Sequence, residues 1–271
     1  GGSYEFIGLG LLGNARWGGL RLSEVLPQIL PAGALSKGSN LHVTFEGLDG
    51  YTTSTPLDYI MDPENECMLV TEMNSEPLPP DHGFPVRALL PGITGARNVK
   101  WVSRINIGPE TTSAWNKTYY KDAETGEPLQ QLPLNSVLLT PEPGTVISTD
   151  AVSIAVQGVA YPGGTGSSIS QVEVSADRGK SWQTARCRFD QLPTDVSARH
   201  AWVLFEAHVE LPPAAAAGCG LPLEELWVRA RCANGEEQPE VSRAHGGYFY
   251  NGYHKVPLIR QPAADLASQA A

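Results

Sequence analysis

In the C-terminal half of the chain, apolar and polar residues alternate in short segments that are separated by turns rich in glycine and proline. Successive side chains of a strand point to opposite faces of a sheet, so each alternating segment predicts a strand with one buried face. Strands at this spacing are typical of an antiparallel sandwich of the immunoglobulin-like type. The predicted strands cover residues 152–160, 169–176, 184–189, 201–211 and 226–232.

The N-terminal part mixes helical and extended segments. Residues 22–30 have a helical pattern that contains Pro27, which predicts a short or bent helix because proline lacks a backbone N–H. Thr55 followed by Pro56 predicts the start of a second helix, with threonine as the N-cap and proline at the first helical position. Strands are predicted at residues 41–47, 67–73 and 99–107.

The change of pattern predicts two domains. A polar, turn-rich connector at residues 109–133 precedes the purely β part, and a chain of 271 residues exceeds the usual content of one core. We therefore expect an α+β fold, with a mixed α/β domain at residues 1–134 and an all-β, immunoglobulin-like domain at residues 135–271.

The composition excludes several classes of protein. Hydrophobic residues make up 41% and charged residues 18%, as in a folded chain. With 19 Lys and Arg against 29 Asp and Glu, the net charge is −10, so no nucleic-acid partner is expected: the chain has no surplus of cations to neutralise phosphates. No apolar run reaches the roughly 18 residues that a spanning helix needs, so no membrane partner is expected either.

The spacing of cysteines and histidines predicts no metal site. The four cysteines lack C-x-x-C spacing and are too few for a disulfide scaffold, so we expect reduced structural thiols, which mildly favours a reducing compartment. The six histidines show neither H-E-x-x-H nor another metal-ligand spacing.

Three motifs have a functional and a structural interpretation, and the structural one is favoured for each. Residues 8–13 match G-x-G-x-x-G, but Gly18 and Gly19 would break the helix that a dinucleotide site needs, which predicts a glycine-rich turn. Residues 175–182 resemble the aspartate box of sialidases, which repeats in those proteins and occurs once here, so we expect a structural hairpin. The glycosylation sequon at Asn116 is interpreted as a chance triplet.

One basic stretch contrasts with the acidic chain around it. Residues 83–107 hold Arg87, Arg97, Lys100 and Arg104 and no acidic residue. The arginine fork, the lysine charge and the backbone donors of the glycine-rich turn suit a bound anion such as phosphate. The structural alternative is a solvated basic face that balances the acidic excess.

The same stretch carries motifs of a known family. The sequence DHGFPVR at residues 81–87, followed by PGITGARNVKW at residues 91–101, closely resembles the sulfite oxidase family of molybdopterin enzymes, to which assimilatory nitrate reductase also belongs. The resemblance extends over residues 5–257. Supporting segments are ARWGGLRLSEVL (15–26), FEGLD (45–49) and NGYHKV (251–256).

This resemblance implies a mixed domain that binds the molybdopterin cofactor, followed by an immunoglobulin-like dimerisation domain. By position, His82 and Arg87 would hold the pterin phosphate and ring system, and Lys100 would face the anionic end. Asp49 would accept hydrogen bonds from pterin nitrogens. The implied cofactor-binding residues are Asp49, His82, Arg87, Asn98, Val99 and Lys100.

A tyrosine is the implied catalytic residue. Tyr120, in SAWNKTYYK at residues 113–121, takes the place of the family's active-site tyrosine, and its phenol would hydrogen-bond a molybdenum oxo group or the bound oxyanion. Tyr119 is the competing assignment, and an ordinary loop tyrosine is the structural alternative.

Two departures from the family pattern bear on the chemistry. The family's metal-ligating cysteine lies in a C-x-G-N-R-R-like segment upstream of residues 15–26, and Cys67, at a strand position, is not expected to replace it. A fragment of a longer protein is the favoured explanation, and loss of the chemistry is the alternative. The family's substrate-binding arginine corresponds here to His245 or Gly246, with Arg243 close by.

The resemblance implies a soluble, mitochondrial or cytoplasmic oxidoreductase that depends on molybdopterin and transfers an oxo group to or from a small oxyanion such as sulfite. A homodimer is implied as well. The sequence contains no cytochrome b5 segment, so a separate electron acceptor is expected. The alternative from another class is a non-catalytic scaffold or dimerisation module that has lost the metal thiolate.

Overall fold

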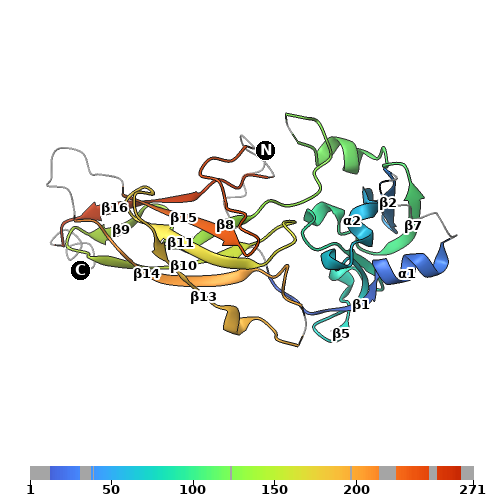
Figure 1. Cartoon of the computed structure of the whole chain (residues 1–271), viewed down its shortest axis with the longest axis horizontal. Coiled ribbons are helices and arrows are strands. Elements are labelled where there is room, and N and C mark those ends of the chain that lie inside the picture. Colours follow the sequence, from blue (N-terminus) through green and yellow to red (C-terminus); the bar gives the residue numbers. More distant parts are fainter. Residues whose placement is uncertain are drawn as a thin grey trace. The chain divides into compact units, whose positions relative to one another are not determined.

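The computed structural model of the chain describes residues 13–30, 38, 40–122, 124–195, 197–213, 224–243 and 249–263. These residues form two compact units, which divide along most of the chain between Leu132 and Pro133 (Figure 1). The first unit mixes strands with short helices, and the second is built almost entirely from strands. The α+β fold class expected from the sequence is therefore confirmed.

Two small antiparallel sheets organise the first unit. The strands are β1 (Trp17–Arg21), β2 (His42–Gly47), β3 (Thr52–Pro56), β4 (Met68–Met73), β5 (Glu76–Pro77), β6 (Arg87–Leu89) and β7 (Val102–Gly108). In one sheet β4 pairs with β1, β5 and β6, and in the other β2 lies between β3 and β7. Val43 and Phe45, alternate residues of β2, are fully buried, as the alternating pattern predicts.

Short helices complete the first unit. They are α1 (Leu22–Ile29), α2 (Leu57–Met61), the 3-10 turns η1 (Pro63–Asn65), η2 (Pro80–His82) and η3 (Gly95–Arg97), and a π-helix, η4 (Trp115–Tyr119). Helix α1 buries Leu22 and Leu26, one turn apart, and ends soon after Pro27, so the expected short helix is confirmed. Strand β7 begins later than predicted, because η3 and a left-handed residue, Trp101, precede it.

The predicted start of the second helix is wrong in detail. Thr55 does not cap α2; it continues β3, and its hydroxyl donates a hydrogen bond to the side chain of Gln130 (3.3 Å). Pro56 occupies the N-cap position instead of the first helical position, and no side chain caps this end. Pro56 pairs with His42 in the β2–β3 ladder, so the extended conformation of the strand overrides the local capping signal.

The second unit is a β-sandwich. Its elements are β8 (Asn135–Thr140), β9 (Thr145–Ser148), β10 (Ser153–Tyr161), β11 (Ile169–Ser175), β12 (Gln183–Thr184), β13 (Arg186–Cys187), the 3-10 turn η5 (Phe189–Gln191), β14 (Val203–Glu210), β15 (Glu224–Cys232) and β16 (His254–Gln261). One sheet has the order β13–β14–β10–β8 and the other β12–β11–β15–β16–β9, antiparallel apart from the β16–β9 pair (Figure 1). The single strand predicted at residues 184–189 is divided among β12, β13 and η5. Buried side chains from both sheets form one core.

The alternation of residues does not predict β8, β9 and β16. In β16, one of the buried positions is Arg260, which is 2% exposed and interrupts the apolar period. Its guanidinium donates to the carbonyls of Thr149 (2.8 Å), Ala151 (3.2 Å) and Pro212 (2.8 Å). Hydrogen bonds of this kind offset the free energy that burial of a charge costs, so a charged residue can hold a core position.

The hairpin that joins β11 and β12 confirms the structural interpretation of residues 175–182. The carboxylate of Asp177 accepts hydrogen bonds from the amide (2.8 Å) and the hydroxyl (2.6 Å) of Ser181. Gly179 has φ +80°, and a Cβ at this position would lie 3.2 Å from the ring of Trp227. These features close a tight turn and account for the residues of the motif by their structural roles.

Gly158 lies in β10, between two paired strands, where a side chain has no room. A Cβ there would lie 2.2 Å from the ring of Phe205 and 2.4 Å from the carbonyl oxygen of Val137. We expect Gly158→Ala to lower the free energy of unfolding of the second unit by about 3 kcal/mol, because overpacking displaces the paired strands. Chemical denaturation followed by circular dichroism measures this loss. Gly235→Ala, strained at φ +88° but in open space, should cost only about 1 kcal/mol; equal losses would contradict the prediction.

Candidate functional site

Gly83 lies next to the start of two basic side chains, those of Arg87 and Lys100. It ends the 3-10 turn η2 with φ +110°, a conformation that favours glycine. A Cβ at Gly83 would lie 3.0 Å from the Cβ of Arg87 and 3.0 Å from the Cβ of Lys100. The side chains of Arg87 and Lys100 therefore leave the backbone on either side of one glycine, and a larger residue would push them apart.

The carbonyls of the same turn hold both cations. The ammonium of Lys100 donates to the carbonyl of Asp81 (2.7 Å), and Nη1 of Arg87 donates to the carbonyl of His82 (3.1 Å). The guanidinium of Arg87 also lies over the ring of Trp17, 5.0 Å from its centroid. Sequence reasoning missed Trp17, because nothing in its local pattern indicates which cation it faces.

Arg87 has an unused donor that points to a ligand. Its Nε is buried and has no hydrogen-bond partner among the described residues. Burial lowers the pKa of the Arg87 guanidinium. A buried donor without a partner costs free energy, which an added acceptor would recover. This corner of the first unit therefore suits a compact anion.

The opposite side of the turn is fixed by a tryptophan. The indole N–H of Trp101 donates to the carbonyl of Pro80 (2.9 Å), and Trp101 itself has φ +51°. The ammonium of Lys100 lies 5.1 Å from the centre of the same ring. Trp101, which is half-buried, thus holds η2 beside Lys100, and His82, at the end of η2, is exposed.

Asp49 lies beside the backbone of Lys100. It is exposed, in the turn after β2, and its carboxylate accepts a hydrogen bond from the amide of Tyr51 (3.1 Å). A Cβ at Gly47 would lie 2.5 Å from this carboxylate and 2.9 Å from the carbonyl of Lys100. Asp49 and the carbonyl of Lys100 therefore both lie next to Gly47.

Asn98 and Val99 face the protein instead of solvent. The side-chain oxygen of Asn98 accepts from the amide of Leu90 (2.6 Å), and its side-chain nitrogen donates to the carbonyl of Thr94 (3.1 Å). Val99 is 2% exposed and packs in the core of the first unit. The backbone amides of both residues also donate to carbonyls within the protein.

The other two cations of the basic stretch do not join the pair. Arg97 is fully buried, and its guanidinium donates only to protein acceptors, among them the carbonyl of Leu129 (3.0 Å). Arg104 is exposed on β7 and lies 3.7 Å from the carboxylate of Glu46. Thus, of the four cations, Arg87 and Lys100 are the two whose side chains start beside Gly83.

Tyr120 directly follows the π-helix η4. Its carbonyl accepts hydrogen bonds from the amide of Leu129 (2.9 Å) and from Nη2 of Arg97 (3.2 Å). Tyr119, the competing residue, is 54% exposed, and its ring stacks on Trp115 at 5.0 Å. Tyr120 is thus linked through Arg97 to the segment that begins at Asn98, whereas Tyr119 faces solvent.

Some residues discussed in the sequence lie outside the described part: residues 8–12, Cys219, His245 and Gly246. In the described ranges, no three His, Cys, Asp or Glu side chains are grouped so that they could hold a metal ion. No helix of this part is long and apolar enough to cross a bilayer. The asparagine of the sequon, Asn116, is fully buried, which agrees with a chance triplet.

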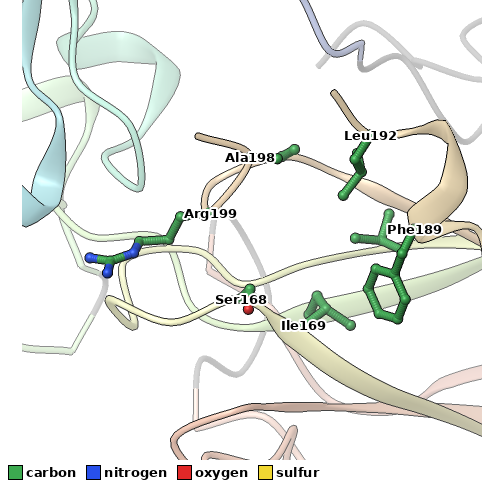
Figure 2. Close-up of a pocket in the computed structure, with 8 residues that line it drawn as sticks. Ser168, Ile169, Phe189, Leu192, Ala198 and Arg199 are labelled. Atoms are coloured by element: carbon green, nitrogen blue, oxygen red, sulfur yellow. The ribbon is translucent and has the colours of Figure 1, made fainter. Parts of the chain in front are cut away.

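The β-sandwich has a separate hollow, which is lined mainly by apolar side chains. Figure 2 shows the apolar side chains of Ile169, Phe189 and Leu192 around it, while the guanidinium of Arg199 points away from them. The residues that line this hollow are Ser168, Ile169, Phe189, Leu192, Ala198, Arg199, Ala201 and Val203. They include no carboxylate, thiol or imidazole, so we do not assign catalysis to this place.

Comparisons with known proteins identify relatives over both units. Residues 5–116 match the family model described as oxidoreductase molybdopterin binding domain, and residues 126–261 match the one described as Mo-co oxidoreductase dimerisation domain. The mitochondrial sulfite oxidase of Drosophila melanogaster is 34% identical over 93% of this chain and 46% of its own length. That of Rattus norvegicus is 39% identical over 74% of this chain and 39% of its own length.

Nitrate reductase (NADH) 1 of Oryza sativa subsp. japonica is 33% identical over 83% of this chain and 27% of its own length. The chain thus spans less than half the length of these curated relatives. Among solved structures, the sulfane dehydrogenase SoxCD from Paracoccus pantotrophus has a TM-score of 0.67 and 24% identity. That match covers 89% of this chain and 59% of the other, and it shows a shared fold.

The reactivity of Cys67 tests whether its buried thiol is accessible and ionised in the folded protein. It is 2% exposed, and burial raises the pKa of its thiol to about 12. We expect Cys67 to resist iodoacetamide at about pH 8 in the folded protein, because almost no thiolate is present, and to react after denaturation. Mass spectrometry of the peptide that contains Cys67 measures this, with the half-buried Cys187 as comparison. Rapid modification in the folded state would show that the thiol is accessible.

Proposed function

The chain belongs to the sulfite oxidase family of molybdopterin oxidoreductases, and on this premise we propose that it forms the cofactor-holding part of an enzyme that transfers an oxo group to or from a small oxyanion such as sulfite. One observation carries the proposal: the side chains of Arg87 and Lys100 both start beside Gly83, and both bond carbonyls of the turn before it, in a chain of net charge −10. A local pair of cations in an acidic protein selects for a bound anion.

The residues present fit the cofactor at its phosphate end. Arg87, with its unpartnered buried Nε, and Lys100 would hold the phosphate, and His82 would border it from the exposed end of η2. Asp49 would accept hydrogen bonds from pterin nitrogens, and the backbone of Asn98 and Val99 would line the cofactor. When bound, the group supplies the molybdenum that exchanges an oxo group in a two-electron step.

Tyr120 is the residue we propose to act on the substrate. Its phenol would donate a hydrogen bond to the reacting oxyanion and orient it. Tyr119 is less suited to this role because its ring is exposed and stacked on Trp115. Arg243, which is exposed, lies close in sequence to the position of the family's substrate-binding arginine.

The partners of the protein are also proposals. Oxidation of sulfite to sulfate takes oxygen from water and releases two electrons and two protons, so the enzyme needs an electron acceptor, which we propose to be a separate domain or protein. We further propose a homodimer through the β-sandwich, because residues 126–261 match a domain described by dimerisation. The alternative of a non-catalytic scaffold is not favoured, because sulfite oxidases and nitrate reductases match over most of the chain.

Removal of either cation tests the cofactor site. We expect Arg87→Ala and Lys100→Ala to lower the pterin content of the purified full-length protein at least about tenfold, because each removes a charge-assisted contact to the phosphate. Fluorescence of the oxidised pterin measures the content. Arg104→Ala, from the same basic stretch but exposed and paired with Glu46, is the matched control and should retain the cofactor. Normal pterin content in both site variants would refute the assignment.

The glycine between the cations gives a second test. Gly83→Ala places a Cβ 3.0 Å from both Arg87 and Lys100, so we expect it to spread the pair and reduce pterin content by roughly tenfold. Gly126→Ala has the same kind of positive φ, +72°, but its Cβ meets nothing within 4 Å. It therefore reproduces the backbone strain without touching the cations. Equal pterin content in the two variants would mean that the spacing of the cations does not matter.

A further inference from the structure

Arg97 carries a buried positive charge that no proposed cofactor contact uses. Its Nε donates to the carbonyl of Leu129 (3.0 Å), and its Nη1 donates to the side-chain oxygen of Asn116 (2.5 Å). Its Nη2 donates to the carbonyls of Asn116 (3.3 Å) and Tyr120 (3.2 Å). All these acceptors are neutral groups of the protein, so the planar fork of Arg97 determines where several segments lie and is not open to an external anion.

Asn116 extends this network to the sheet. Its side chain is fully buried, its oxygen also accepts from the amide of Ser54 in β3 (3.1 Å), and its nitrogen donates to the carboxylate of Glu110 (2.9 Å). Burial would raise the pKa of Glu110, but hydrogen bonds from Lys117 and Asn116 keep that pKa below its ordinary value, so the carboxylate stays charged. The segment that leads to Tyr120 is therefore held by polar contacts on two sides.

The backbone of this segment has an uncommon form. The π-helix η4 spans Trp115–Tyr119, and π-helices are rare and are found frequently at functional sites. The carbonyl of Asn116 inside the π-helix and the carbonyl of Tyr120 after it both receive donors from Arg97, which lies outside it. Arg97 thus supplies hydrogen bonds that stabilise the wider turn and the exit of the chain from it.

We propose that Arg97 is a positioning residue that sets the place of Tyr120 relative to the segment 98–100. The inference rests on the proposed function, in which segment 98–100 contacts the cofactor and the phenol of Tyr120 meets the substrate. Arg97 directly precedes Asn98 in the chain and holds the carbonyl of Tyr120, so one residue joins the two parts of the site. It acts through these neighbours and touches neither cofactor nor substrate.

The effect of Arg97→Lys, measured in the wild-type protein and in a Tyr120→Phe variant, separates a positioning role from a general structural one. Arg97→Lys keeps the charge but replaces the fork by one ammonium, which cannot serve the acceptors on Leu129, Asn116 and Tyr120 together. In the full-length protein with its cofactor, we expect kcat for sulfite oxidation with ferricyanide to fall roughly tenfold to a hundredfold while pterin content is unchanged. In a Tyr120→Phe background, the same change should alter kcat by less than about twofold, because its effect passes through the phenol. An equal loss in both backgrounds would overturn the inference.

Trypsin gives a readout that needs no turnover. Lys117 lies inside η4, and we expect Arg97→Lys to speed cleavage after it by roughly tenfold, because local opening exposes the segment. Arg104→Lys is the control and should leave cleavage and kcat unchanged. If Arg97→Lys does not fold, Arg97→Gln is measured in the same way.

The outcomes test separately the positioning role of Arg97 and the proposed substrate, sulfite. Wild-type cleavage and wild-type kcat in the Arg97 variant would refute the positioning role, whatever the substrate. Faster cleavage, together with a wild-type protein that holds pterin but oxidises no sulfite, would support the positioning role and refute sulfite as the substrate.

Discussion

Gly83 has φ +110°, and a Cβ there would lie 3.0 Å from the Cβ atoms of both Arg87 and Lys100, so these two side chains start close together. Burial of Arg87 carries a desolvation cost that lowers the pKa of its guanidinium. The carbonyls of Asp81 and His82 offset part of this cost. A bound anion would offset more of it, because charge-assisted hydrogen bonds are the strong ones. The backbone at Gly83 thus sets where both basic side chains begin.

The four cations of one basic stretch acquire different roles according to their acceptors. Arg97 is satisfied inside the protein and holds other segments in place, whereas Arg87 keeps a buried donor without a partner among the described residues. Arg104 lies at the surface beside Glu46, where an ion pair contributes little to stability. The ammonium of Lys100 donates to one carbonyl and has further N–H donors. The four cations thus differ in their hydrogen-bond acceptors, although all carry the same charge.

Both units use a buried arginine in the same physical way. Arg97 in the first unit and Arg260 in the second are each about 2% exposed or less, and both donate to backbone carbonyls of segments distant in the chain. Loop carbonyls lack the partners that a helix or sheet provides, so one guanidinium can satisfy several of them. Removal of such a residue would leave these carbonyls without donors, which is why Arg97 can transmit position from the cofactor segment to Tyr120.

The sequence by itself determined the features that depend on local pattern. These are the alternating strands of the sandwich, the short helix at Pro27, and the family motifs DHGFPVR and GARNVKW. These are readable because the pleat of a strand and the spacing of a motif are local properties of the chain. Only the tertiary structure decided that Asn98 and Val99 turn inward, that Arg97 is buried, and that Arg260 occupies a core position. The direction of a long or polar side chain depends on donors and acceptors far away in sequence, and no local pattern records them.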